Sequence, residues 1–234
     1  MDMSRSHGLE SGIVSFQPDE LIVRVRAGTS MTDLRDVLAT RGQRLRIPMI
    51  GTVGGAVASR RNGPYPSDNR GMPNIVLQIT ATDGEGRSFR AGGTTVKNVS
   101  GFDLVKILVG SRGTLATITE VLFRTEPIPA ASRWFAGSGI TSVLHRPSAV
   151  IRVGERCFVN IEGHPDDVEE QFRLLEGFEA VDTPTDEWLV ANGPTVASRA
   201  RIDDPTMAIC RRLKAAFDPH NHLSPELSHQ MGLT

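Results

Sequence analysis

The sequence contains few cysteines, few lysines and few aromatic residues, and each shortage argues against a class of protein. Its two cysteines, Cys157 and Cys210, form no CxxC pair, which argues against a zinc or iron–sulfur site. Lysine occurs only at positions 97, 106 and 214, and the formal net charge of −1 provides no basic surface for nucleic acid or an anionic membrane. Aromatic residues make up 5% of the chain, too few for a base-stacking surface, so we expect no nucleic-acid partner.

The sequence also lacks the apolar runs of targeting and membrane segments. The N-terminal residues MDMSRSHGLESG contain no apolar core of a signal peptide, and no stretch approaches the roughly 18 apolar residues of a membrane span. We therefore predict a cytoplasmic protein without a membrane span. With 234 residues, 39% of them hydrophobic and 23% charged, the chain is long enough for one large globular domain or two small ones.

Hydrophobic periodicity and turn residues predict an α+β chain with a boundary near the Pro-Ile-Pro run at 127–129. Before it we expect strands over 12–16, 21–27, 74–82, 87–91 and 115–124, and helices over 31–40 and at the end of 99–109. Beyond it we expect strands over 149–153 and 157–162, and helices over 166–175 and 206–217. We predict a hairpin turn at 83–86. The expected division is 1–127 and 128–234.

Three glycine-containing segments stand out in the first two thirds of the chain. They are residues 51–55 (GTVGG), 92–103 (GGTTVKNVSGFD) and 110–114 (GSRGT). Glycine lets backbone N–H groups approach a phosphate closely, and a following helix adds a positive dipole end. The alternative for each segment taken singly is a tight turn or close packing. None of them is a Walker loop, and none is the GxGxxG fingerprint after a strand.

The order and spacing of these segments point to one family. Residues 21–124 resemble the FAD-binding domain of the vanillyl-alcohol oxidase (PCMH-type) flavoproteins, and within that family the FAD-binding subunit of glycolate oxidase. The resemblance rests on VRAGTSMTDLRDVLATRGQ, IGTVGGAVAS, AGGTTVKNVSGFDLVKILVGSRGTLATITEV and RRLKAAFDPHNHLSP. It implies an α+β fold with a truncated first subdomain, a mixed-sheet second subdomain and a small C-terminal α+β cap-like unit, whose last helix returns to the FAD domain.

The resemblance also implies a set of cofactor-binding positions. They are Gly51, Thr52, Gly54, Gly55, Lys97, Asn98, Gly101, Asp103, Arg112, Gly113, Thr114 and Ile118. Gly113, Thr114 and Ile118 match a strand that contacts the flavin through its backbone. Lys97 and Arg112 are the candidate cations for the negative charge at the N1–C2=O edge of a reduced flavin; the alternative is that both point into water. We expect non-covalent FAD, because no His or Cys anchor is evident.

Family members normally begin with a βαβ unit whose Arg/Gly-rich loop wraps the FAD pyrophosphate, whereas the match here starts near residues 2–5. Three explanations stay open. The true start codon lies upstream, another chain supplies the unit, or the chain is a degenerate subunit that binds FAD poorly or not at all. A missing strand would leave an unpaired sheet edge around residues 21–27.

No catalytic residue is assigned, because none of the six histidines has a neighbour that marks it as a base. His220 and His222 form a His-x-His pair without a nearby third ligand, so we expect a solvated turn and no metal site. The first functional hypothesis is an FAD-dependent oxidoreductase, or its FAD-binding subunit, which oxidises a small 2-hydroxy acid of the glycolate or lactate type by hydride transfer to flavin. The alternative is a non-catalytic interaction subunit with a degenerate flavin site that stabilises a larger flavoprotein or iron–sulfur partner.

Overall fold

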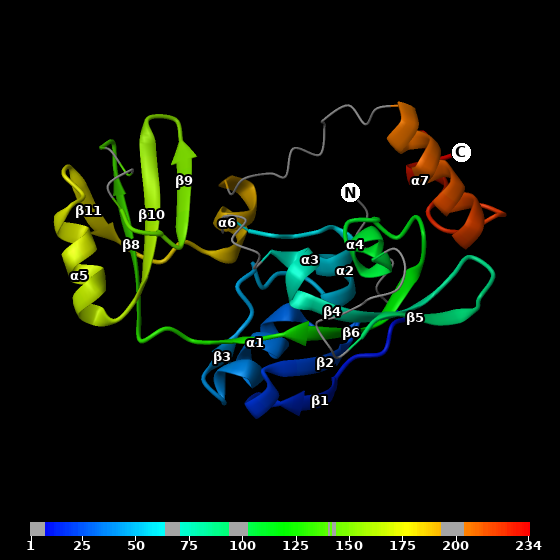
Figure 1. Ribbon diagram of the computed structural model, residues 1–234, viewed down its shortest axis with the longest axis horizontal. Helices are drawn as coiled ribbons and strands as arrows, with labels where there is room; N and C mark the ends of the chain where they lie inside the picture. Colours follow the sequence, from blue (N-terminus) through cyan, green and yellow to red (C-terminus); the bar gives the residue numbers. More distant parts are fainter. Residues whose placement is uncertain (1–7, 64–70, 94–102, 140, 142–143, 193–203) are drawn as a thin grey trace.

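Two antiparallel sheets organise the protein. The structure is a computed structural model that describes residues 8–63, 71–93, 103–139, 141, 144–192 and 204–234. A five-stranded sheet is formed by residues before position 125, and a four-stranded sheet by residues after position 130. Figure 1 shows the two sheets side by side, with the C-terminal helices next to the first sheet and away from the second.

The five-stranded sheet has the order β1-β2-β6-β4-β5. Its strands are β1 (Ile13–Gln17), β2 (Ile22–Arg26), β4 (Val76–Thr82), β5 (Ser88–Gly92) and β6 (Thr117–Arg124). All its pairings are antiparallel, so the prediction of a mixed sheet was wrong. Two of its connections are short: a 3-10 turn (Pro18–Glu20) joins β1 to β2, and a hairpin joins β4 to β5. Connections this short join only antiparallel strands.

The predicted open edge at residues 21–27 was also wrong. Strand β2 lies inside the sheet, hydrogen-bonded to β1 on one side and to β6 on the other. The residues that cover it are those just before it in the chain, which fold back over the turn as β1. The outer strands of the sheet are instead β1 and β5.

Helices cover one face of this sheet and enclose the main core. They are α1 (Met31–Ala39), α2 (Val53–Ala58), α3 (Met72–Ile75) and α4 (Leu104–Leu108). Buried side chains from all four pack with those of β2, β4 and β6 in one cluster, and Figure 1 shows α2, α3 and α4 on the same side of the sheet. The other face carries polar contacts: the Arg24 guanidinium donates to Glu120 at 2.8 Å and to Gln78 at 3.0 Å. One apolar and one polar face are typical of an antiparallel sheet.

The four-stranded sheet has the order β11-β8-β10-β9 and is apolar on both faces. Its strands are β8 (Ala131–Gly137), β9 (Ala149–Val153), β10 (Arg156–Gly163) and β11 (Phe178–Val181). One face packs against α5 (Pro165–Arg173), with the Phe135 and Phe172 rings stacked 4.4 Å apart. The other packs against α6 (Asp186–Asn192), where the Phe158 and Trp188 rings lie 4.7 Å apart.

Two small elements and two C-terminal helices complete the fold. The strands β3 (Gln43–Arg44) and β7 (Glu126–Pro127) pair with each other between the two large sheets. The C-terminal helices are α7 (Asp204–Phe217) and α8 (Pro225–Gln230). Among the helices that the structure describes, none is both long and apolar enough to span a bilayer. The division of the chain into 1–127 and 128–234 remains a prediction.

The elements predicted from periodicity are confirmed, with ends that shift by at most two residues. The helix expected over 31–40 begins after Ser30, whose side chain accepts a hydrogen bond from the Thr32 amide as an N-cap does. The strand expected over 149–153 is β9. The elements β8, β11, α6 and α8 were not predicted, because their apolar patterns are short or irregular.

Candidate functional site

The first glycine segment is the N-terminal turn of α2. Gly51 has φ of +73°, a left-handed conformation that suits glycine, and its carbonyl accepts a hydrogen bond from the Met31 amide at 2.8 Å. Thr52 is the N-cap, and its side-chain oxygen accepts from the Gly55 amide at 3.2 Å. A left-handed glycine followed by a capping threonine and small residues is a local signal for this turn and for a short helix after it.

Gly54 lies where α2 touches the end of β2. A Cβ atom on Gly54 would lie 2.9 Å from the Cβ of Ala27, closer than side-chain carbons approach each other, and its amide donates to the Ala27 carbonyl at 2.9 Å. Close packing of helix on strand therefore accounts for this glycine without a ligand.

Three amides of this segment, those of residues 53–55, already have partners in the protein. Val53 donates to the Thr29 carbonyl at 2.9 Å, Gly54 to Ala27, and Gly55 to the Thr52 side chain. A phosphate bound at this helix end would need free N–H groups, so these three amides do not fit a phosphate cradle. Gly51 and Gly55 are nevertheless exposed and carry no side chain, which leaves their backbone open at the surface.

The third glycine segment is docked on the other end of α2. The Gly110 amide donates to the Val57 carbonyl at 3.1 Å, and the Arg112 amide donates to the Ala58 carbonyl at 2.8 Å. Arg112 is exposed and has a left-handed backbone, with φ of +54°. The structure thus brings the first and third segments together through a single six-residue helix.

Thr114 and Ile118 point into the protein. Thr114 is 1% exposed, and its hydroxyl donates to the Ser111 carbonyl at 2.6 Å. Ile118 is buried in the main core on β6. Any cofactor contact at these two positions must run through the backbone, which is the role that the resemblance implies for them.

The middle of the second glycine segment, with Lys97, Asn98 and Gly101, lies outside the described residues. Its last residue, Asp103, is the N-cap of α4, where its carboxylate accepts from the Lys106 amide at 3.4 Å and pairs with the Lys106 ammonium at 3.3 Å. The helix that Asp103 caps leads into the third segment, since the Ser111 amide donates to the Leu108 carbonyl at 3.1 Å.

A buried ion pair at the end of α7 was missed by the sequence analysis. Lys214 and Asp218 lie 2.6 Å apart with side chains 2% and 0% exposed, and the Lys214 ammonium also donates to the Thr114 carbonyl at 2.9 Å. Burial would raise the pKa of Asp218, but hydrogen bonds from Lys214 and from the backbone outweigh burial and lower it. The available signal was an i, i+4 Lys–Asp pair at the end of the predicted helix.

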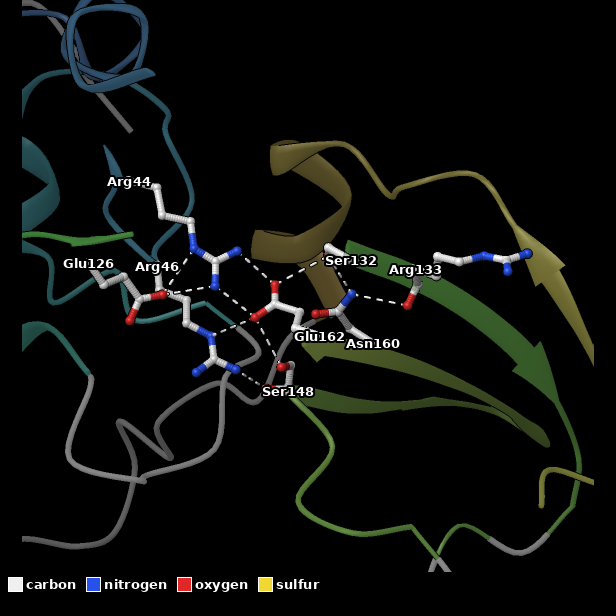
Figure 2. Close-up of polar contacts among 8 residues, drawn as sticks. All are labelled: Arg44, Arg46, Glu126, Ser132, Arg133, Ser148, Asn160 and Glu162. Carbon is white, nitrogen blue, oxygen red and sulfur yellow. Dashed lines mark hydrogen bonds and ion pairs between the residues drawn. The ribbon is translucent and has the colours of Figure 1, made fainter. Parts of the chain in front are cut away.

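A second charged cluster joins the β3–β7 pair to the four-stranded sheet (Figure 2). The Arg44 guanidinium donates to both oxygens of Glu162 at 2.7 Å and to Glu126 at 2.9 Å. Arg46 donates to the Ser148 carbonyl at 2.9 Å, and its Nε lies 3.8 Å from Glu162. A fork-shaped, two-bond contact of this kind fixes orientation as well as distance.

The pKa values in this cluster are shifted so that both partners stay charged. Burial alone would raise the pKa of Glu162, but the hydrogen bond from Arg44 and the charges of Arg44 and Arg46 outweigh burial and lower it. Burial alone would lower the pKa of Arg44, and the bonds and charges of Glu162 and Glu126 outweigh that effect and raise it. Both arginines of the cluster therefore lie next to the Glu162 carboxylate, and Arg44 also pairs with Glu126.

The histidine pair forms no metal site in the described part of the chain. The ring nitrogen Nδ1 of His222 lies 3.0 Å from the Gly84 carbonyl, and His220 Nε2 lies 3.9 Å from Glu85. Among described residues, no group of three or more His, Cys, Asp or Glu side chains could hold a metal ion. Both histidines are exposed, and the turn that contains them contacts the β4–β5 hairpin.

Comparison with known proteins relates this chain to FAD-linked oxidoreductases. No model of a known protein family matches it. The glycolate oxidase subunit GlcE of Escherichia coli is 36% identical over 126 residues, which are 52% of this chain and 36% of that protein. A D-lactate dehydrogenase of Archaeoglobus fulgidus is 43% identical over 76 residues, which are 32% of this chain and 17% of that protein. An uncharacterized FAD-linked oxidoreductase of Mycobacterium tuberculosis is 32% identical over 106 residues, 44% and 23% of the two chains.

The fold is similar to that of a solved structure. An alkyldihydroxyacetonephosphate synthase superposes with a TM-score of 0.57 and 15% identity, covering 76% of this chain and 42% of that one. At this identity the likeness concerns the fold alone. The matches span between 17% and 36% of the length of the three curated relatives. About half of this chain is thus similar in sequence to a glycolate oxidase subunit, to D-lactate dehydrogenases and to an FAD-linked oxidoreductase.

Proposed function

We propose that this chain forms part of the non-covalent FAD site of a flavin-dependent oxidoreductase, or of its FAD-binding subunit, that oxidises a small 2-hydroxy acid. The observation that carries the proposal is the 36% identity to the glycolate oxidase subunit GlcE over half of the chain. The D-lactate dehydrogenase relatives support the same substrate class, since lactate and glycolate are both 2-hydroxy acids.

The contact surface in this proposal is formed by the ends of α2. Exposed Gly51 and Gly55 offer backbone without side chains at one end, and residues 110–114 are bonded to the other. Bound FAD would supply the hydride acceptor. Arg112, exposed on its loop, is the described cation that would stabilise negative charge on the reduced ring, and Lys97 is its partner in the undescribed segment.

The remaining predicted positions have positional roles in this proposal. Thr52 caps α2, and Gly54 allows that helix to approach β2. Asp103 caps α4, while Asn98 and Gly101 belong to the same segment as Lys97. Since the amides of residues 53–55 are bonded within the protein, we infer that the FAD pyrophosphate is held by other groups.

One observation favours the alternative of a non-catalytic subunit. The helix end that the sequence analysis assigned to cofactor binding has no free amide at residues 53–55. A chain that only stabilises a larger flavoprotein or iron–sulfur partner needs no such amides. The two functions differ in whether the chain itself takes up flavin.

Flavin titration of the purified chain tests the proposal. Added FAD should bind with a saturating heat signal in isothermal titration calorimetry, and anaerobic glycolate or D-lactate should then bleach the visible flavin absorbance. Arg112→Asn removes a cation at a left-handed position that asparagine tolerates, and it should weaken FAD binding about tenfold. Arg146→Asn is the matched control, because Arg146 is an exposed arginine with φ of +50° near the second sheet, and it should leave FAD affinity unchanged.

Two results would count against the proposal. A wild-type chain that gives no heat with FAD, alone or with its redox partner, would leave the non-catalytic alternative. Flavin that binds and is not bleached by either acid would exclude the substrate class and leave the FAD site intact.

A further inference from the structure

The ammonium of Lys214 has all its donors satisfied by groups from two parts of the chain. It donates to the Asp218 carboxylate at 2.6 Å, to the Leu223 carbonyl at 3.0 Å and to the Thr114 carbonyl at 2.9 Å. An ammonium has three N–H donors, so each has one acceptor. The bond to Thr114 spans 100 positions and reaches the loop bonded to the end of α2.

Asp218 closes the same cluster from its other side. Its Oδ1 accepts from the His222 amide and its Oδ2 from the Leu223 amide, each at 2.8 Å. The side chains of the pair are 2% and 0% exposed, and hydrogen bonds from a full set of partners offset the cost of burying both charges. The carboxylate thereby folds residues 219–223 around the ammonium.

Apolar contacts already hold this end of α7 against the first sheet. Leu213 and Phe217 pack against the main core, the Phe217 ring lies 5.4 Å from that of Phe89, and the Phe217 carbonyl accepts from the Gly84 amide at 2.9 Å. A hydrophobic residue at position 214 could add to this packing. The charged pair instead provides a directed bond to one carbonyl, that of Thr114.

The loop of residues 110–114 is therefore held from two sides. On one side, the Gly110 and Arg112 amides donate to carbonyls at the end of α2. On the other side, the Lys214 ammonium of α7 donates to the Thr114 carbonyl. The Ser224 hydroxyl also lies 3.8 Å from where a Cβ on Gly113 would be. Fixing the loop from the C-terminal side would hold the Thr114 backbone and the exposed Arg112 in one position.

We infer that Lys214 and Asp218 are positioning residues that fix the backbone of the 110–114 loop for flavin contact. The inference rests on the proposed function for its flavin part, while the positioning of the loop stands on the bond from Lys214 to Thr114.

Amide hydrogen exchange of the flavin-free full chain tests the positioning. In Lys214→Met the bonded amides of Ser111, Arg112 and Thr114 should exchange about ten- to a hundredfold faster, the range expected for loss of a hydrogen bond from a charged donor. The Val121 amide in β6 should not change. Glu162→Gln breaks a half-buried ion pair between β3 and the four-stranded sheet, and should leave the loop amides at their wild-type rates.

An equal rise in the exchange rates of the loop amides and of Val121 would show that the pair stabilises the whole domain and does not position the loop. That result would overturn the inference. If Lys214→Met does not fold, Lys214→Arg keeps the charge and donors in a different geometry and is measured in its place. Its loop amides should then exchange faster than those of the wild type, and unchanged rates would overturn the inference.

FAD affinity of the same variants separates this inference from the proposed function. Lys214→Met should weaken FAD binding about tenfold while Glu162→Gln leaves it unchanged. Faster loop exchange with unchanged FAD affinity would overturn the flavin part, since the loop would then be fixed but not in contact with the cofactor. A wild-type chain that binds no FAD would remove the proposed function, and the exchange result would still decide whether Lys214 positions the loop.

Discussion

The two sheets of this protein are stabilised in different ways. The five-stranded sheet packs one face against four helices in a single large core and leaves polar side chains on the other face. The four-stranded sheet has a small apolar cluster on each face, under α5 and under α6. A single large core holds its elements together even where loops at the helix ends expose backbone. The described parts of the candidate cofactor segments belong to that sheet, its helices and the loops next to them.

The unfolding of each sheet can be followed with its own probe. Both tryptophans of the chain, Trp134 and Trp188, lie in the clusters of the four-stranded sheet. Tryptophan fluorescence therefore follows the unfolding of that part, whereas amide exchange at β6 follows the five-stranded sheet. The charged cluster around Arg44 and Glu162 is one polar link between the two parts, and the Arg35–Asp186 ion pair between α1 and α6 is another.

The largest effect on stability is expected from removing a buried aromatic ring in the four-stranded sheet. Phe135 is fully buried and stacked on Phe172, so Phe135→Ala should cost about 3–5 kcal/mol. Urea unfolding followed by tryptophan fluorescence should shift to lower urea, while exchange at Val121 stays unchanged. Phe123→Ala, a fully buried ring in the larger core, is the matched variant and should accelerate exchange at Val121. Equal shifts of both probes in both variants would show that the two sheets unfold as one unit.

A smaller effect is expected at the link between the sheets. Glu162→Gln removes one of the two carboxylates that pair with Arg44, so that only Glu126 remains, and should lower the free energy of unfolding by roughly 2–3 kcal/mol at neutral pH. The folded-state pKa of Glu162 is below its ordinary value, so the stabilisation is present above about pH 4.3 and is lost as the pH falls through that lowered pKa. Urea unfolding of both proteins across this pH range should show the difference shrink in acid. Glu155→Gln, at an exposed turn, should show no difference at any pH.

The smallest effect concerns the two neighbouring glycines of α2. Gly54→Ala places a methyl group 2.9 Å from the Ala27 Cβ and should destabilise the protein by about 1–3 kcal/mol. Gly55→Ala meets only the Thr52 side-chain oxygen, at 3.1 Å, and should stay within about 1 kcal/mol of wild type because alanine favours helix. Thermal unfolding of the two variants measures the contrast. Equal losses would contradict the close-packing account of Gly54.

The elements that the sequence predicted well are those whose signals are local. Ser30 before an apolar-periodic run marked the start of α1, and Asp83 with two glycines marked the hairpin between β4 and β5. Strand β8 was missed because its first residues, Ala131 to Arg133, are polar or small and show no clean alternation. The prediction of a mixed sheet was wrong because it was taken from the resemblance. The short connections between β1 and β2 and between β4 and β5 indicate antiparallel pairing.

For the candidate site, the sequence by itself determined which segments carry small residues and left-handed turns. The sequence also showed the similarity of these segments to a glycolate oxidase subunit. Short motifs and local backbone preferences depend on neighbouring residues, so they can be recognised without the tertiary structure. Only the tertiary structure decided which group each amide and charge meets: Gly54 bonds to Ala27, Lys214 to Thr114 and Arg44 to Glu162. These partners lie 27, 100 and 118 positions apart, and their meeting depends on sheet order and helix docking, which local periodicity does not encode.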